Sequence, residues 1–297
     1  MRRGHVIAMV IAATLVAAVG LVAAIVLVNR PDLLSGRIAA PPGGIADLPA
    51  ASAAPAGPRQ EEDEDLGTVD VYDVVPDASL RPAAAGLVAE VWATFLRVAT
   101  PDFAVESVSA YKVGDAPASD LLASVTQNGD DARWSLAVNL ATSEDTGQLV
   151  ATLVHELMHL ISLGVSQESA DVALCTTVRS SEGCARDDSY LAAFRTAFWS
   201  GYGPGAPNAD NGDDGVAQRF YAEHEDDFVS EYAATNVIED IAESFMAYVL
   251  EPTVPDPVQG IVAAKLAFFD GYPELAAIRE RIRAEFRGEL PQLADVG

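Results

Sequence analysis

The hydrophobic and polar positions divide the chain into an apolar N-terminal run, a polar stretch without periodicity and a long patterned part that begins near residue 68. The apolar run, residues 6–28, contains no charge. The polar stretch is rich in Pro, Ala and Gly and ends in an acidic run, and such a composition buries no core. We therefore predict three units: a cytoplasmic stub with a transmembrane helix at 1–30, a linker at 31–67 and a folded domain at 68–297.

The folded part changes its hydrophobic period along its length. Short apolar or alternating runs predict strands at residues 103–112, 121–126 and 134–140, and Asn128-Gly129 between the last two predicts a hairpin turn. The helical period predicts helices at 80–99, 144–163, 188–199, 215–224, 237–250, 258–269 and 273–286. This order indicates an α+β fold, with a small sheet first and a mostly helical C-terminal half.

Polar residues and breakers refine these boundaries. Pro101 follows the helix expected at 80–99 and is typical of a residue that ends one. Thr142 and Asp145 can form a capping box at the start of the next long helix. Gly164 fits the position just past the end of that helix.

The N-terminal run indicates a membrane location. As a helix it extends about 34 Å, enough for a hydrocarbon core of about 30 Å. Arg2 and Arg3 precede it, which keeps the N-terminus cytoplasmic and the rest of the chain extracytoplasmic. The run ends in Ile25-Val-Leu-Val-Asn-Arg30, a poor cleavage site. We therefore expect a single-pass signal anchor in the cell membrane, with secretion after signal cleavage as the alternative.

Charge and cysteine content narrow the function further. The chain has 18 basic and 44 acidic residues, a net charge of −26, which argues against nucleic acid as a partner. Its two cysteines, Cys175 and Cys184, stand outside any C-x-x-C pattern and predict a disulfide, which fits an oxidising compartment. The acidic run at residues 61–65 is expected to be solvated linker, with a cation site as the alternative.

The helix expected at 144–163 contains the motif H-E-x-x-H. On a helix, His155 and His159 lie on one face, one turn apart, and two imidazoles so placed can bind one zinc ion. Glu156 then lies beside the metal and can take a proton from water. The flanking residues are uncharged and mostly bulky, which predicts a buried helix whose polar groups need partners. Two hydrogen-bonded core histidines are the alternative to a metal site.

A hydrolytic zinc site has a third protein ligand and one open position. Ser162 and Val165 occupy the Gly and third His positions of the metzincin pattern, which excludes that class. Glu239 and Glu243 are four residues apart on an apolar helix, so one can ligate zinc while the other accepts the free N–H of a ligand histidine. His224 is an alternative ligand, and the two glutamates can alternatively lie on the surface.

This second segment resembles the second motif of gluzincin metallopeptidases, in which a downstream helical Glu completes H-E-x-x-H. It is most similar to the branch with the catalytic fold of lethal factor and the bacterial Pro-Pro endopeptidases. In lethal factor a Tyr stands four residues before the Asn of T-N-x-x-E-x-x-A-E. This chain has the same letters at the same spacing: Tyr232, Thr235, Asn236, Glu239, Ala242 and Glu243.

The resemblance implies a zincin-like metallopeptidase domain. It makes Glu239 the zinc ligand and gives Glu243 and Asn236 the role of holding the ligands in place without binding the metal. It makes Tyr232 the phenol that hydrogen-bonds the oxyanion. The chain departs from lethal factor in the separation of His159 and Glu239, which is 80 positions here and is clearly longer. The excess holds the cysteine pair and a loop rich in Gly and Asp, so no substrate preference is transferred.

That loop, at residues 201–215, contains Asp210, Asp213 and Asp214 and suggests a calcium loop as a further alternative. The spacing of the EF-hand fails, however, because its twelfth position is Tyr221 in place of Glu.

Together these features predict an extracytoplasmic, membrane-anchored zinc metalloendopeptidase with one Zn²⁺ per chain. The expected partners are a peptide or protein substrate and, through the N-terminal helix, the membrane. The edge of the strand at 134–140 can pair with an extended peptide, or it can be an ordinary sheet edge. Two other functions stay open: a non-catalytic, zinc-stabilised surface binding module with a fourth ligand, and a protease-like scaffold that binds no zinc.

Overall fold

The computed structural model describes residues 57–128, 132–169, 173–181 and 183–292. The expected membrane anchor at 1–30 and most of the expected linker lie outside these residues. Within the described ranges, no helix has both the length and the apolar character that a membrane crossing requires.

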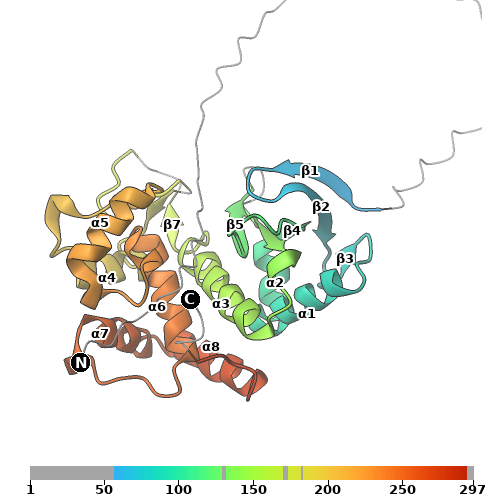
Figure 1. Cartoon of the computed structure of the whole chain (residues 1–297). Helices are drawn as coiled ribbons and strands as arrows, with labels where there is room; N and C mark the ends of the chain where they lie inside the picture. The colour runs from blue at the N-terminus through green and yellow to red at the C-terminus, as the bar shows by residue number, and fades with distance from the viewer. Residues whose placement is uncertain (1–56, 129–131, 170–172, 182, 293–297) are drawn as a thin grey trace, which may run out of the picture.

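A small mixed sheet lies in the first half of the fold, as the sequence predicts, but it has six strands where three were expected (Figure 1). Its order is β1-β2-β4-β6-β5, and the short β3 pairs with β2. Only β4 and β6 run parallel; the other pairs are antiparallel. The strands are β1 (Arg59–Asp63), β2 (Gly67–Val74), β3 (Leu80–Arg81), β4 (Val108–Gly114), β5 (Ala123–Gln127) and β6 (Trp134–Asn139). Strand β5 therefore lies at one edge of the sheet. The expected free edge on the strand at 134–140 is wrong, because this strand, β6, is paired on both sides, with β4 and with β5.

Among the described residues, two α-helices lie between β3 and β4 and six follow the last strand of the sheet, β6. In chain order the helices are α1 (Leu87–Ala99), α2 (Pro101–Ser107), α3 (Thr146–Ser162), α4 (Tyr190–Phe194), α5 (Asp214–His224), α6 (Val237–Leu250), α7 (Ile261–Phe268) and α8 (Pro273–Glu285). A small two-stranded sheet, β7 (Glu168–Ser169) and β8 (Cys184–Ala185), lies between α3 and α4. The α+β class and the helical second half are confirmed.

Helices α3 and α6 pack against each other at the centre of the molecule and join its two halves (Figure 1). Helix α3 also packs against α1 and against the edge strand β5. One continuous hydrophobic core runs from the sheet through α3 into α6, and it includes Leu136, Leu153 and Phe245. The fold therefore holds the two segments that carry the sequence motifs against each other.

Two expected elements of the first half have different boundaries. The helix expected at 80–99 begins only at Leu87, because Leu80 and Arg81 pair with β2 as a short strand. The first part of the strand expected at 103–112 is helix α2, because Thr100 accepts a hydrogen bond from the Phe103 N–H and Pro101 occupies the first turn. Pro101 thus starts a helix as well as following one.

The predicted antiparallel pairing of the hairpin is confirmed, since β5 and β6 pair from Ala123–Val138 to Gln127–Trp134. Gly129 of the expected turn lies outside the described residues. The acidic run, however, is not all linker, because β1 pairs with β2 from Arg59 onward. Lys112 Nζ lies 3.0 Å from Glu61, and Arg59 lies 2.7 Å from an oxygen of Asp73. These partners offset part of the negative charge of the acidic run. Because β1 is paired, the folded part begins earlier than the expected residue 68.

The motif helix begins at Thr146, and its cap differs from the expected capping box. Asp145 is itself the N-cap and accepts the Gln148 N–H at 3.0 Å, whereas the Thr142 hydroxyl bonds to Asn139 O. Gly164 directly follows Leu163, the C-cap residue of the helix, as predicted. A Cβ there would meet Leu160 O at 2.8 Å, so the close backbone approach favours glycine.

A fully buried ion pair holds α6 against α7. Lys265 Nζ lies 2.6 Å from an oxygen of Asp240, and both side chains have no exposed surface. Trp199 Nε1–H and the Ser244 hydroxyl also donate to the Asp240 carboxylate. Burial raises the pKa of Asp240 to about 6, against the opposing effect of Lys265. The Asp240 carboxylate therefore depends on these three donors.

We expect Lys265→Met to destabilise the fold by about 3–5 kcal/mol, because it leaves a buried carboxylate without its cation. Denaturant unfolding measures the loss. Lys112→Met is the matched control, since Lys112 forms a partly exposed pair with Glu61, and such pairs contribute about 0–1 kcal/mol. Equal losses in the two variants would contradict the role of the buried pair.

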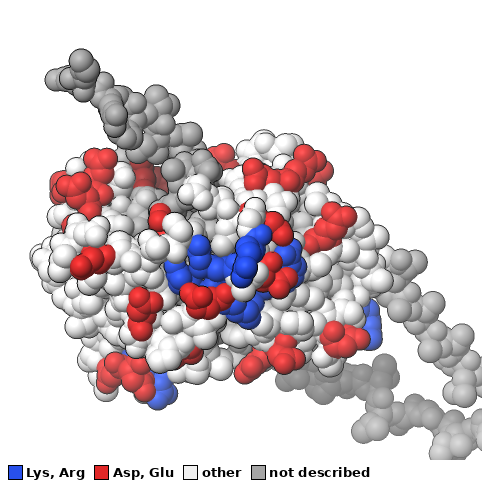
Figure 2. Space-filling model, turned by 90° about the horizontal axis from the view of Figure 1, so that it is seen from below, with Lys and Arg blue, Asp and Glu red and all other residues white. Residues whose placement is uncertain are grey.

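Arginines of α8 bind backbone carbonyls at the ends of two other helices. Arg279 and Arg283 donate to carbonyls at the C-terminal end of α6, and Arg281 donates to carbonyls at the end of α1. Cations stabilise helix C-termini, where carbonyls lack intrahelical donors. The face seen from below shows a basic patch with acidic residues around it (Figure 2). Several of the arginines of α8 are thus engaged in structural contacts.

Candidate metal centre and cleft

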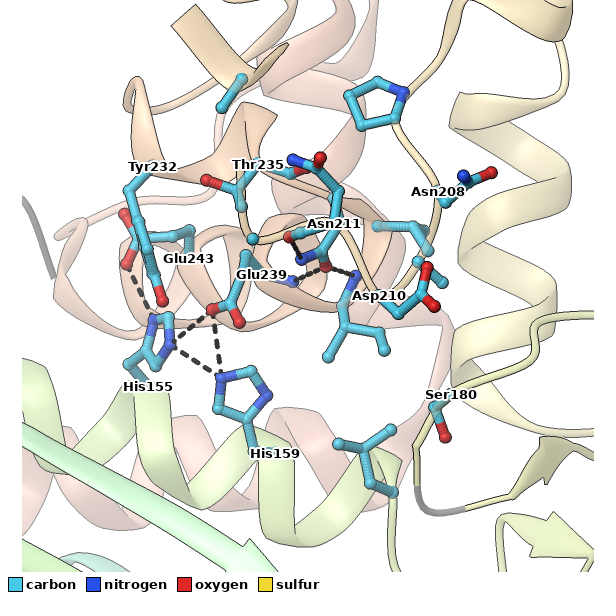
Figure 3. Close-up of a pocket in the computed structure, with 18 of the residues that line it drawn as sticks. His155, His159, Ser180, Asn208, Asp210, Asn211, Tyr232, Thr235, Glu239 and Glu243 are labelled. Atoms are coloured by element: carbon cyan, nitrogen blue, oxygen red, sulfur yellow. Dashed lines mark hydrogen bonds and ion pairs between the residues drawn. The ribbon is translucent and has the colours of Figure 1, made fainter. Parts of the chain in front are cut away.

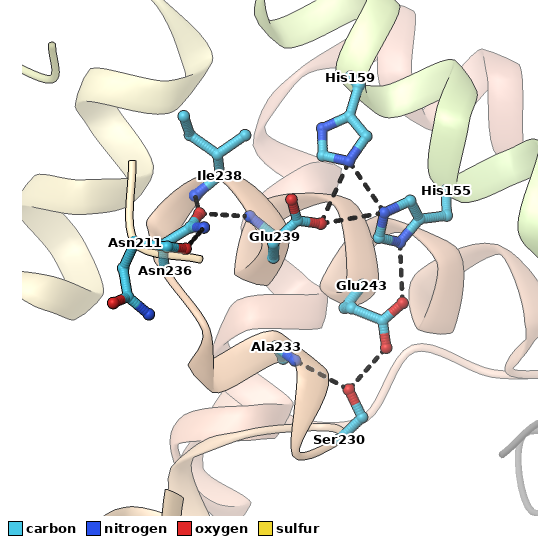
Figure 4. Close-up of polar contacts among 9 residues, drawn as sticks. All are labelled: His155, His159, Asn211, Ser230, Ala233, Asn236, Ile238, Glu239 and Glu243. Carbon is cyan, nitrogen blue, oxygen red and sulfur yellow. Dashed lines mark hydrogen bonds and ion pairs between the residues drawn. The ribbon is translucent and has the colours of Figure 1, made fainter. Parts of the chain in front are cut away.

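Helix α6 is buried along its whole length, so each of its carboxylates needs a partner. Asn236 caps the helix, and its Oδ1 accepts the N–H groups of Ile238 at 2.8 Å and of Glu239 at 3.0 Å. This cap fixes the first turn, from which Glu239 projects toward α3 (Figure 4). The surface alternative for Glu239 and Glu243 is therefore wrong, since their exposed fractions are only 9% and 8%.

His155, His159 and Glu239 converge on one point between α3 and α6 (Figure 3). The two Nε2 atoms are 2.9 Å apart, and Glu239 Oε2 lies 3.3 Å from each of them. Glu239 Oε2 is buried and has no hydrogen-bond partner in the described chain. Two ring nitrogens and a carboxylate oxygen that converge in this way can hold a metal ion.

Glu243 fixes which nitrogen of His155 faces this point. Its Oε1 lies 2.8 Å from His155 Nδ1 (Figure 4). A carboxylate only accepts, so Nδ1 carries the proton, and Nε2 of the neutral ring presents its lone pair. This is the arrangement in which an imidazole ligates a metal while a carboxylate orients it. The predicted division of labour between Glu239 and Glu243 agrees with this geometry.

The electrostatics of the three converging residues favour a positive charge among them. Burial acts to lower the pKa of His155, but Glu239 and Glu243 outweigh it and raise that pKa well above its usual value. Burial acts to raise the pKa of Glu239, but His159 and His155 outweigh it and lower that pKa. A metal ion must therefore displace a proton from His155, and its affinity should rise with pH.

Glu156 lies in the same cleft but outside the group of three ligating residues. Glu156 directly follows His155 on α3, and the residue is 5% exposed. Burial raises the pKa of Glu156, and the two neighbouring imidazoles oppose this. A carboxylate with a raised pKa beside a metal site is suited to accept and return protons.

Tyr232 lies on the His155 side of the same cleft, and its side chain points toward the imidazole (Figure 3). The two ring centroids are 5.8 Å apart. Tyr232 stands in a short 3-10 turn, Tyr232–Ala234, that directly precedes the cap of α6. The predicted residues Tyr232, Asn236, Glu239 and Glu243 thus come from one continuous stretch around the start of α6.

The cleft has walls from several parts of the chain. The edge strand β5 lines one side, the loop that contains Asp210 and Asn211 lines another, and residues 177–181 also contribute. Its volume of about 2330 Å³ exceeds the roughly 300–1,000 Å³ of pockets for small ligands. The cleft is large enough to accept a segment of polypeptide.

The disulfide and the alternative ligands are also located. Cys175 and Cys184 are bonded, as predicted. His224 is not part of the metal-ligating group: it packs against the rings of Tyr202 and Phe220 at the end of α5. Among the described residues, the acidic loop at 201–215 contributes no group of converging metal ligands.

Sequence reasoning missed two sets of polar partners near the site. Ser230 donates to Glu243, and Asn211 exchanges hydrogen bonds with the cap of α6, since Asn211 Nδ2 bonds to Thr235 O and Asn236 Nδ2 bonds to Asn211 O. No local pattern marks these residues, because their partners are far away in the sequence. Lys265, by contrast, carries a detectable signal as a lone charge in the apolar run 261–269.

Comparisons with protein-family models, with curated proteins and with solved structures find no match.

Proposed function

We propose that this chain is a zinc-dependent metallopeptidase with a zincin-like catalytic domain. The observation that carries the proposal is the convergence of His155, His159 and Glu239 at the floor of a polypeptide-sized cleft that also contains Glu156. The disulfide between Cys175 and Cys184 supports an extracytoplasmic location, because disulfides persist in oxidising compartments. A membrane anchor at residues 6–28 completes the proposal.

The donor set and its spacing favour zinc. Two histidines and one glutamate form a common catalytic zinc shell, which keeps one position open. Tetrahedral ligands at about 2.0–2.1 Å from zinc stand about 3.3–3.4 Å apart. The three edges of the donor triangle here are 2.9, 3.3 and 3.3 Å. A zinc ion in this shell supplies Lewis acidity and makes water reactive near neutral pH.

The residues around this shell have distinct tasks in peptide hydrolysis. Glu156 accepts a proton from the attacking water and delivers it to the leaving amine. The Tyr232 hydroxyl donates a hydrogen bond to the oxyanion that forms on the scissile carbonyl. Strand β5 offers its free edge to an extended substrate, which can add to the sheet through main-chain hydrogen bonds.

Metal analysis of the purified outer domain, beside a peptide-library cleavage assay, tests the proposal. We expect one zinc per chain and cleavage that a chelator removes and added zinc restores. Zinc binding without cleavage of any peptide would favour a zinc-stabilised binding module. Failure to bind zinc would favour a protease-like scaffold.

We expect Tyr232→Phe to lower kcat by about 10²–10³-fold, the effect typical of losing one oxyanion donor. Zinc affinity and thermal stability should hardly change, because the ring stays in place. Tyr221→Phe is the matched control, since Tyr221 also lines the cleft. An unchanged kcat in the Tyr232 variant would remove the tyrosine from the mechanism.

A further inference from the structure

Ser230 lies behind the metal centre and contacts two of its supporting elements (Figure 4). Its hydroxyl donates to Glu243 Oε2 at 2.6 Å. The same oxygen accepts the N–H of Ala233 at 3.0 Å. The Ser230 hydroxyl thus donates its proton to the carboxylate, and its oxygen accepts a hydrogen bond from the following turn.

The first contact completes the hydrogen bonding of Glu243. This buried carboxylate has two oxygens, and His155 occupies only Oε1. A buried carboxylate oxygen without a donor is costly, and a short bond from a hydroxyl to an ionised oxygen is among the stronger hydrogen bonds. The chain of contacts runs from Ser230 through Glu243 to His155, whose other nitrogen faces the metal position.

The second contact fixes the turn that carries Tyr232. Ser230 precedes the 3-10 turn Tyr232–Ala234 and bonds to an N–H of that turn three residues further on. The bond resembles an N-cap bond, although Ser230 stands one residue before the N-cap position, which Glu231 occupies. Loss of the hydroxyl therefore releases the turn as well as the carboxylate.

We propose that Ser230 is a positioning residue that couples the orientation of the ligand His155 to the placement of Tyr232. The inference rests on the proposed function, because it assigns Ser230 a task at the same metal centre. Ser230 does not ligate the metal; it acts through Glu243 and through the backbone of the turn.

Zinc affinity, measured by competition with a chelator, tests the link from Ser230 through Glu243 to His155. Groups that orient metal ligands typically contribute about 10–100-fold to affinity, and we expect Ser230→Ala to weaken zinc binding by about tenfold. Ser230→Thr should restore most of this affinity, because it keeps the hydroxyl. Ser244→Ala is the matched control: it also removes a serine donor from a buried carboxylate of α6, that of Asp240, yet it should leave zinc affinity unchanged.

A double-mutant cycle separates this role from general destabilisation. In a Glu243→Gln background, Ser230→Ala should weaken zinc binding no further, because the path to His155 is already broken. Additive losses, or an unchanged affinity in Ser230→Ala, would overturn the inference while leaving the proposed function in place. A wild-type chain that binds no zinc would overturn both.

Turnover tests the link from Ser230 to the turn that carries Tyr232. At saturating zinc, Ser230→Ala should still lower kcat, with little change in KM, because the turn that carries Tyr232 is released. In a Tyr232→Phe background this remaining loss should disappear. If the loss of kcat persists there, Ser230 does not act through the tyrosine.

Discussion

Glu156→Gln should lower turnover of a cleaved peptide by about 10²–10⁴-fold, the range that a general base contributes. The amide has the shape of the carboxylate but accepts no proton at neutral pH. Zinc content should stay at the wild-type level, because Glu156 is outside the donor triangle of His155, His159 and Glu239. Metal analysis and initial rates on the same sample measure both quantities.

Glu144→Gln is the control for this variant, since Glu144 is an exposed acid just before the motif helix. It should keep wild-type turnover. Full activity in Glu156→Gln would show that another group takes the proton. Loss of zinc in that variant would instead show that Glu156 helps to hold the metal. The raised pKa of Glu156 adds a further expectation, namely that activity falls on the acidic side as this carboxylate becomes protonated.

The sequence predicted those helices and strands whose caps, turns and apolar pattern lie within the element itself. Helix α6 has its expected bounds, because Asn236 is a strong N-cap and apolar residues follow on every face. The hairpin of β5 and β6 was predictable from its two runs and the Asn128-Gly129 signal. Strand β1 was not, because its acidic residues pair with β2 through the backbone. Such pairing leaves no trace in hydropathy when the strand lies at an exposed sheet edge.

The metal site could be predicted as far as short motifs reach. H-E-x-x-H predicted His155, Glu156 and His159. The spacing of Glu239 and Glu243 on an apolar helix predicted that pair, and the resemblance assigned the role of each. The remaining partners depend on tertiary packing. Asp240 carries no sequence signal for burial, yet it is fully buried, because Lys265 from α7 neutralises it. Ser230 carries no motif at all, since its contact with Glu243 arises only when the turn folds onto α6.

Glu239→Gln should weaken zinc binding by more than about 100-fold, the upper end of what ligand-orienting groups contribute. The amide oxygen is neutral, so one anionic ligand is lost from a buried site that Glu239 shares with two imidazoles. Peptide cleavage should fall in parallel and recover partly at high zinc. Competition with a chelator and initial rates across a zinc titration measure these effects.

Two further variants of the same helix allow the losses of zinc affinity to be ranked. Glu243→Gln should weaken zinc binding by about 10–100-fold, because Glu243 orients His155 without ligating the metal. Glu251→Gln, at the C-terminal cap of α6, should change nothing. The order of losses, Glu239 above Glu243 above Glu251, follows from the three positions along one helix. Equal losses for Glu239 and Glu251 would remove Glu239 from the shell, and the remaining pair of histidines could not support the proposed hydrolysis.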